Sequence, residues 1–310
     1  MTSANRITGV LSPVVTPFDK DLRPDADRLI NQCRWLIDNN VGLALFGTNS
    51  EANSLSVGEK IDLLEKIVDA GIPTARMMPG TGCCSLTDSV ELTRKAVELG
   101  CGGTLMLPPF YYKGVSDEGL YRNYAEIIDR VGSATLKIYL YHIPPVAQVP
   151  ISLGLIERLL KDFPGTIAGI KDSSGDWDNT AAMLKDFQPE GFDVFAGSET
   201  FLLQTMRAGG AGCISATANV NPGPIARLAD TWQADDADDQ QAALDAVRSI
   251  FQGYVMIPAL KAATAHYAKD PDWVRVRPPL VELNDAQRAE LVETLTKHGF
   301  EMPGLGSTNG

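Results

Sequence analysis

Lys171 is the residue whose type and position offer the clearest reactive chemistry. It directly follows the apolar run 167–170, which is typical of a buried strand. Burial lowers the pKa of an amine because the charged form loses its hydration. A neutral amine can attack a carbonyl carbon and form an imine. The alternative is a structural lysine that pairs with Asp172 or reaches solvent, and position alone leaves the two interpretations even.

Three other groups follow or end apolar runs. Tyr141 lies near the end of the run 137–142, where a phenol could move protons to and from a carbinolamine, although a strand tyrosine more often only packs. Thr48 and Asn49 lie in the turn 47–51, whose successive N–H groups could form a nest for a carboxylate, or which is an ordinary turn. Tyr112 lies in a loop beside a second tyrosine, and one of the two could face a site.

The elements that must position these groups alternate along the chain. Apolar runs cover residues 9–15, 41–47, 74–79, 103–107, 137–142, 167–170, 193–196 and 211–216. They are mostly apolar rather than alternating, as strands buried on both faces should be, and amphipathic helical segments separate them. Eight such repeats predict a closed parallel barrel, the (β/α)8 TIM barrel, whose active sites lie at the carboxyl ends of the strands. The alternative is an open doubly wound sheet, but the turn after the first run lacks its glycine fingerprint.

The pattern changes after about residue 229, where an acidic run is followed by helical segments alone. Residues 240–269 and 284–297 have no strand between them, so they predict a C-terminal helical appendix. We therefore expect a catalytic barrel over residues 1–229 and a C-terminal helical region over residues 230–310.

Composition excludes several classes of function. The net charge of the 310 residues is −12 and no basic cluster occurs, which argues against a nucleic-acid partner. No apolar run is long enough for a membrane span, and residues 1–9 hold no apolar stretch typical of a signal peptide. The 5 cysteines form no CxxC pair, and the 3 histidines are isolated. We therefore expect a cytoplasmic protein with reduced thiols, no metal site and no cofactor.

The strand ends together resemble the dihydrodipicolinate synthase / N-acetylneuraminate lyase family. The matching pieces are GTNSE at 47–51, PPFYYK at 108–113, YHIPP at 141–145, GIKDSSGD at 169–176, AGSE at 196–199 and GCISATANV at 212–220. The likeness covers about residues 7–300, and the order of the pieces makes it specific.

The resemblance implies a role for each matching residue. Lys171 would form the Schiff base with a small 2-oxo acid such as pyruvate, and Tyr141 would shuttle protons over it. Thr48 would link Tyr141 to Tyr112 in a hydroxyl relay. In this family the tyrosine at the Tyr112 position often comes from a neighbouring subunit. In addition, the amides of Thr48 and Asn49 would hold the substrate carboxylate, and Gly197 and Ile214 would line the pyruvate pocket. The family is commonly tetrameric, so we expect a homotetramer built as a dimer of dimers.

Two departures from the family pattern bear on the substrate. Asn49 and Ser50 replace the second hydroxyl residue and the glycine of the usual turn, which changes how a carboxylate would be held. The synthases carry an arginine five residues after the tyrosine, where it grips the distal carboxylate of aspartate semialdehyde. Here that position is Val146, which cannot form a bidentate contact, and nothing in the sequence shows that Lys113 compensates.

We therefore expect an aldolase that cleaves a 4-hydroxy-2-oxo acid or a 2-keto-3-deoxy sugar acid to pyruvate and an aldehyde. Three alternatives stay open. The same imine could serve a dehydratase or deaminase of a deoxy-keto acid or a pyrroline carboxylate. The chain could also be the 4-hydroxy-tetrahydrodipicolinate synthase itself, or a barrel that binds 2-oxo acids without turnover.

Overall fold

The computed structural model describes residues 6–306, which form two compact units. The first unit comprises residues 6–9 and Pro73–Ile214, and the second comprises Val10–Ile72 and residues 215–306. No helix in the described part of the chain is both long enough and apolar enough to span a membrane. Residues 1–5, on which the expectation about a signal peptide partly rests, lie outside it. The boundary at residue 229 and the cytoplasmic location stay predictions.

The first unit is built around five parallel strands, hydrogen-bonded in the order β7-β6-β5-β4-β3. The strands are β3 (Thr104–Met106), β4 (Ile138–His142), β5 (Ile167–Asp172), β6 (Asp193–Ala196) and β7 (Gly212–Ile214). Its α-helices are α3 (Leu86–Glu98), α4 (Asp117–Val131), α5 (Pro144–Ala147), α6 (Leu153–Asp162), α7 (Trp177–Phe187) and α8 (Leu202–Arg207). Short 3-10 helices cover Thr74–Arg76, Gln188–Glu190 and Glu199–Phe201.

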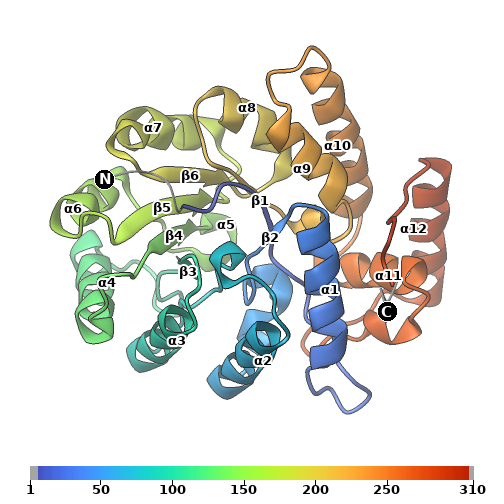
Figure 1. The fold of residues 1–310 in the computed structure, drawn as a ribbon, viewed down its shortest axis with the longest axis horizontal. Helices are drawn as coiled ribbons and strands as arrows, with labels where there is room; N and C mark the ends of the chain where they lie inside the picture. Colours follow the sequence, from blue (N-terminus) through green and yellow to red (C-terminus); the bar gives the residue numbers. More distant parts are fainter. Residues whose placement is uncertain (1–5, 307–310) are drawn as a thin grey trace. The chain divides into compact units, whose positions relative to one another are not determined.

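The helices of this unit cover one face of the strands. In Figure 1, α4, α6 and α7 lie on the outside of β4, β5 and β6. Ile138, Leu140 and Ile170 point to that side and join the apolar cluster that the helices close. Side chains alternate along a strand. Tyr141 and Lys171, which directly follow Leu140 and Ile170, therefore point to the other face.

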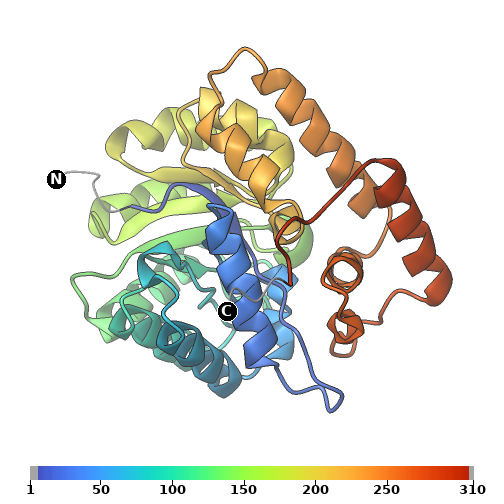
Figure 2. The same cartoon turned by 45° about the vertical axis from the view of Figure 1, so that its right-hand side comes forward.

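The second unit contains β1 (Gly9–Ser12), which enters from the first unit, and β2 (Gly42–Leu43), paired in parallel through Leu11↔Gly42 and Ser12↔Leu43. Its α-helices are α1 (Ala26–Asp38), α2 (Val57–Asp69), α9 (Pro222–Asp230), α10 (Ala237–Gln252), α11 (Met256–Tyr267) and α12 (Asp285–Lys297). Short 3-10 helices cover Thr48–Ser50, Ala52–Ser54, Ala216–Asn219 and Pro271–Val274. The last three α-helices, coloured orange to red, lie near one another in Figures 1 and 2.

The strand prediction differs from the structure at one run. Residues 74–79 do not form a strand; they begin with the 3-10 helix Thr74–Arg76. Two isolated bridge residues follow, Met77 and Gly80, and Gly80 forms a parallel bridge with Leu105. Pro79 has no N–H to donate to a neighbouring strand, which limits the pairing of this run. Seven of the eight predicted runs therefore contain strands within residues 6–306, most of them shorter than predicted.

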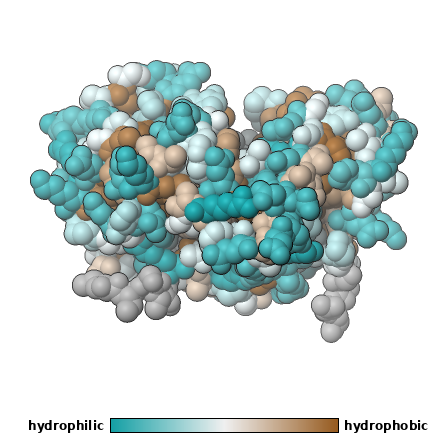
Figure 3. Space-filling view, turned by 90° about the horizontal axis from the view of Figure 1, so that it is seen from above, coloured by the Kyte–Doolittle hydropathy of each residue, from teal (hydrophilic) through white to brown (hydrophobic). Residues whose placement is uncertain are grey.

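Polar residues dominate the surface. Figure 3 shows mostly hydrophilic and intermediate residues on the face that it presents, with hydrophobic residues scattered among them. Larger exposed hydrophobic side chains do occur, and the two most exposed aromatic ones are neighbours, Tyr111 and Tyr112.

Candidate active site

Tyr141 and Lys171 lie side by side near the carboxyl ends of β4 and β5. They are partners in the parallel register, so both side chains leave the same face of the sheet. Lys171 Nζ donates a hydrogen bond to the Tyr141 hydroxyl oxygen at 3.2 Å. Each residue is 3% exposed. The pair thus places an amine beside a phenol in a buried setting.

An irregularity in β5 creates this pairing. Ile138 is the partner of Ile167, but the next residue, Tyr139, is the partner of Gly169, so that Ala168 is skipped. Such a bulge shifts one strand by one residue and re-aims its side chains. Without it Tyr141 would oppose Ile170, and Lys171 would leave the opposite face.

The carboxylate of Asp172 is satisfied without Lys171. Its Oδ1 accepts from the Ser174 N–H at 2.9 Å. Its Oδ2 accepts from Thr180 Oγ1 at 2.7 Å and Asn179 Nδ2 at 3.0 Å. These donors hold Asp172 as a structural group at the start of the loop that leads to α7. The arrangement therefore gives no support to Asp172 as the structural partner of Lys171.

His142 is held in a neutral form. Its Nδ1 accepts the Ile151 N–H at 3.0 Å, so the proton of the neutral ring is on Nε2. Burial lowers the pKa of His142, although the nearby Asp172 carboxylate opposes that shift. The ring therefore ties β4 to the segment before α6, and we assign it no proton-transfer role.

Gly197 and Ile214 belong to the same unit as Lys171. Gly197 follows β6 and donates its N–H to the Asp172 carbonyl oxygen at 2.7 Å. A Cβ at Gly197 would lie 2.7 Å from that oxygen, so only glycine fits this close approach of two backbones. Ile214 is the last residue of β7 and is 0% exposed.

Thr48 and Asn49 lie in the second unit, on the 3-10 helix Thr48–Ser50. The turn is closed on itself, because Ser50 Oγ accepts from the Gly47 N–H at 3.2 Å. Glu51 ends the turn in the left-handed conformation, with φ of 55°. This conformation is uncommon for a residue other than glycine, so other contacts must hold it.

Those contacts are ones that sequence reasoning missed. The Glu51 carboxylate forms an ion pair with Lys261 of α11, and both side chains are 0% exposed. A signal was available in the sequence, because Lys261 is the one charged residue of the apolar segment 255–265. A lysine in such a segment needs a buried partner. Nothing in the sequence, however, pointed to a residue 210 positions away.

Tyr112 is not part of the buried pair. It is 71% exposed and packs edge to face against Tyr111, with 5.4 Å between the ring centroids. Val146, on the short helix α5, is 62% exposed. Lys113 donates to the carbonyl oxygens of Phe110 and Ala147, the latter at 2.7 Å, so its ammonium is already engaged near this loop.

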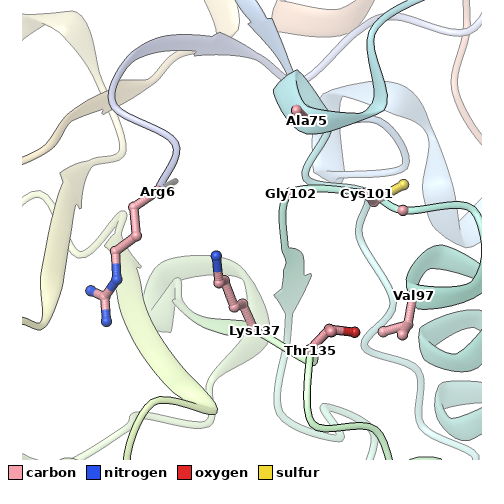
Figure 4. A pocket seen from close by; sticks show the side chains of 8 residues that line it. Arg6, Ala75, Val97, Cys101, Gly102, Thr135 and Lys137 are labelled. Atoms are coloured by element: carbon pink, nitrogen blue, oxygen red, sulfur yellow. The ribbon is translucent and has the colours of Figure 1, made fainter. Parts of the chain in front are cut away.

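A cavity of about 510 Å³ lies at the other ends of the strands in the first unit, as Figure 4 shows. Its lining includes Arg6, Cys101 and Lys137, which precede β1, β3 and β4. Burial raises the pKa of Cys101 to about 12, which leaves an unreactive thiol. Arg6 forms an ion pair with Asp193 at 3.1 Å. Because active sites of parallel barrels lie at the carboxyl ends of strands, we assign this cavity no catalytic role.

Among residues 6–306, no group of three or more His, Cys, Asp or Glu side chains is placed to bind a metal ion.

Comparisons with known proteins show the family of this chain. The family described as "Dihydrodipicolinate synthetase family" matches residues 6–298. An uncharacterized DapA-like lyase of Chloroflexus aurantiacus is 35% identical over 286 residues, which cover 91% of this chain and 94% of that protein.

Two solved structures share the fold. The dihydrodipicolinate synthase of Agrobacterium tumefaciens has a TM-score of 0.86 at 29% identity, covering 94% of this chain and 99% of that one. YagE, a prophage protein of E. coli from the dihydrodipicolinic acid synthase family, solved in complex with pyruvate, has a TM-score of 0.86 at 25% identity with the same coverage. The predicted (β/α)8 TIM barrel with C-terminal helices is confirmed. This chain is a lyase that belongs to the dihydrodipicolinate synthetase family.

Proposed function

We propose that this chain is an aldolase that forms a Schiff base between Lys171 and a 2-oxo acid. Its substrate is a 4-hydroxy-2-oxo acid or a 2-keto-3-deoxy sugar acid, and its products are pyruvate and an aldehyde. The observation that carries the proposal is the 3.2 Å hydrogen bond between Lys171 Nζ and the Tyr141 hydroxyl, buried at the carboxyl ends of adjacent strands. A buried amine with a neighbouring proton carrier is what imine chemistry requires.

The reaction can be written on these two residues. Lys171 Nζ adds to C2 of the substrate. Tyr141 donates its proton to the hydroxyl of the carbinolamine, which leaves as water to give the protonated imine and a Tyr141 phenolate. Tyr141 takes the proton of the C4 hydroxyl while the electrons of the C3–C4 bond move into the imine, which releases the aldehyde and leaves an enamine. A proton returns to C3, and water hydrolyses the imine to free pyruvate and regenerate the Lys171 amine.

Two residues near the end of β4 in sequence or in contact with α5 support this substrate class. Val146 stands where the synthases carry the arginine that grips a distal carboxylate, and Lys113 is engaged with two carbonyl oxygens. A missing charged partner typically costs about 2–5 kcal/mol of binding. This supports a substrate whose aldehyde half carries hydroxyl groups rather than a carboxylate at that position.

Trapping with borohydride tests the proposal. The protein is incubated with pyruvate and reduced, and the digest is analysed by mass spectrometry. We expect one reduced adduct on Lys171, none in Lys171→Ala, and an undiminished yield in Lys185→Ala, which removes an exposed lysine of α7. A folded protein without an adduct on Lys171 would contradict the imine and favour a barrel that binds without turnover.

Product analysis then separates the reactions that share this imine. Deoxy-keto sugar acids and 4-hydroxy-2-oxoglutarate are supplied in turn, and free pyruvate and aldehyde are measured. Their release supports the aldolase. A 2,5-dioxo acid without pyruvate would instead mean that the imine serves elimination of water or ammonia. Turnover confined to aspartate semialdehyde with pyruvate would mean the synthase.

We also infer that the chain assembles into a homotetramer, a dimer of dimers, in which Tyr112 is lent to a neighbouring subunit. The support is the pair Tyr111 and Tyr112, exposed by 75% and 71% although aromatic rings favour burial. Light scattering should give the mass of four chains. We expect Tyr112→Ser to lower turnover and weaken the assembly, and a fully active monomer would contradict the inference.

A further inference from the structure

Glu51 and Lys261 form an ion pair sealed from solvent inside the second unit. Both side chains are 0% exposed. Lys261 lies in α11, where all residues from Pro258 to Ala265 are buried. Burial lowers the pKa of Lys261 to about 8, and the attraction of Glu51 opposes that shift. A buried pair is costly to assemble and costly to break, so each partner fixes the position of the other.

The contacts of the pair converge on one end of the turn that contains Thr48 and Asn49. Glu51 Oε1 accepts from Lys261, and Glu51 Oε2 accepts from the backbone N–H of Arg277 at 2.9 Å. Lys261 Nζ also donates to the Arg275 carbonyl oxygen at 2.6 Å. The backbone of Glu51 in turn donates to the Thr48 carbonyl oxygen at 3.2 Å. The side chain of Glu51 is therefore the link between the turn and the C-terminal segment.

Arg277 fixes the residues that follow the turn. Its guanidinium donates to the Ser54 carbonyl oxygen at 2.6 Å and to the Glu59 carboxylate at 3.0 Å and 2.5 Å. Glu59 completes the capping box of α2 by accepting from the Ser56 N–H at 2.8 Å. Three residues of the segment 51–59, namely Glu51, Ser54 and Glu59, are thus held by side chains more than 200 residues away in sequence.

We propose that Glu51 and Lys261 are positioning residues, which hold the Thr48–Asn49 turn in the shape that receives the carboxylate of the 2-oxo acid. This rests on the proposed function and on the role that the family resemblance implies for the amides of Thr48 and Asn49, which is to bind that carboxylate. Amides bind an anion well only when they are aligned beforehand. The left-handed conformation of Glu51 would relax without its side-chain contacts, and the alignment would be lost. The C-terminal helices thereby gain a role in substrate binding.

The experiment compares Lys261→Met with two controls. Lys66→Met makes the same change in an exposed i,i+4 pair with Asp62 on α2. Leu295→Ala opens a cavity at a buried position of α12 and lowers stability while both residues of the pair are kept. For each variant the rate of borohydride trapping is measured against pyruvate concentration. Hydrogen exchange of the segment 47–54 is followed by mass spectrometry.

We expect Lys261→Met to raise the half-saturating pyruvate concentration by about ten- to a hundred-fold, the range for a misplaced binding group. The maximal trapping rate should stay within about threefold, because Lys171 and Tyr141 are unchanged. The segment 47–54 should exchange faster in this variant alone. If Lys261→Met does not fold, the double variant Glu51→Gln/Lys261→Met, which leaves no buried charge, takes its place with the same expected results.

Two results would overturn the proposal. One is an unchanged half-saturation together with unchanged exchange of the segment 47–54. The other is a loss that Leu295→Ala reproduces, since the pair would then act only through general stability. If the unmodified protein forms no pyruvate adduct, the proposed function fails together with the carboxylate part of this proposal. In that case, hydrogen exchange of the segment 47–54 in Lys261→Met decides whether the ion pair orders the turn.

Discussion

Tyr141 and Lys171 meet because β5 carries one residue more than β4 between their paired positions. The register runs from Ile138↔Ile167 to Tyr139↔Gly169, and the skipped residue is Ala168. In a regular ladder Lys171 would point into the apolar cluster that the outer helices close, where an ammonium group is costly. The bulge is therefore what turns a strand-end lysine into a partner of the phenol.

The hydroxyl of Tyr141 can be tested apart from its ring. Tyr141→Phe keeps the buried ring and removes the hydrogen bond to Lys171. We expect kcat for aldol cleavage to fall by about 10²–10⁴, the range for a lost acid–base group. The matched control is Tyr124→Phe. Tyr124 is 0% exposed in the same unit, and its hydroxyl has no hydrogen-bond partner among the described residues. Turnover of that variant should stay within about twofold; an effect below tenfold for Tyr141→Phe would remove Tyr141 from the proton path.

The bulge itself predicts that Gly169 tolerates no side chain. A Cβ there would lie 2.3 Å from the Asp193 carbonyl oxygen and 2.8 Å from the Tyr139 ring. We expect Gly169→Ala to lower the free energy of unfolding by about 1–3 kcal/mol, the usual cost of overpacking, and to reduce trapping at Lys171. Gly119→Ala is the control, because a Cβ at that position of α4 meets only Ser116 Oγ at 3.6 Å. A Gly169→Ala variant as stable and as reactive as the unmodified protein would contradict the role of the bulge.

The sequence was informative where chemistry follows local pattern. Lys171 and Tyr141 were singled out because each lies near the end of an apolar run, and they are the next-to-last residues of β5 and β4. The sequence was uninformative where a contact depends on how two distant segments pair. A one-residue shift between two strands leaves no mark in either strand alone, and the Glu51–Lys261 pair joins residues 210 positions apart. The prediction of a strand over residues 74–79 was wrong because it rested on apolar content. It did not take into account that Pro79 has no N–H to donate to a ladder.

The Glu59–Arg277 contact predicts how stability depends on pH. The hydrogen bond from Arg277 is the main cause that lowers the pKa of Glu59 to about 2, from an ordinary 4.5. The unfolded chain thus binds this proton more readily than the folded one. The stabilisation by ionised Glu59 is therefore complete above about pH 4.5 and is lost as the pH falls through about 2.

The variant Glu59→Gln isolates this contribution, because glutamine can keep the capping-box bond to the Ser56 N–H. The free energy of unfolding, measured by urea titration, should differ between the two proteins by a constant amount at neutral pH. The difference should shrink between about pH 4.5 and 2. Asp62→Asn, which breaks an exposed pair with Lys66, should change stability little at any pH. A difference for Glu59→Gln that does not vary with pH would mean that the charge of Glu59 contributes nothing.

The proposal that Val146 replaces the arginine of the synthases gives a prediction about specificity. Val146 is 62% exposed on α5, so Val146→Arg should be tolerated without strain in the core. If valine is what excludes a distal carboxylate, the arginine should raise kcat/KM for aspartate semialdehyde with pyruvate. The gain should be at least about thirtyfold, the lower limit for a restored charged contact of about 2 kcal/mol. Val115→Arg adds the same charge at another exposed position, 37% exposed, and should give no such gain. A Val146→Arg variant that gains no more than Val115→Arg would mean that other residues of the pocket determine the choice of aldehyde.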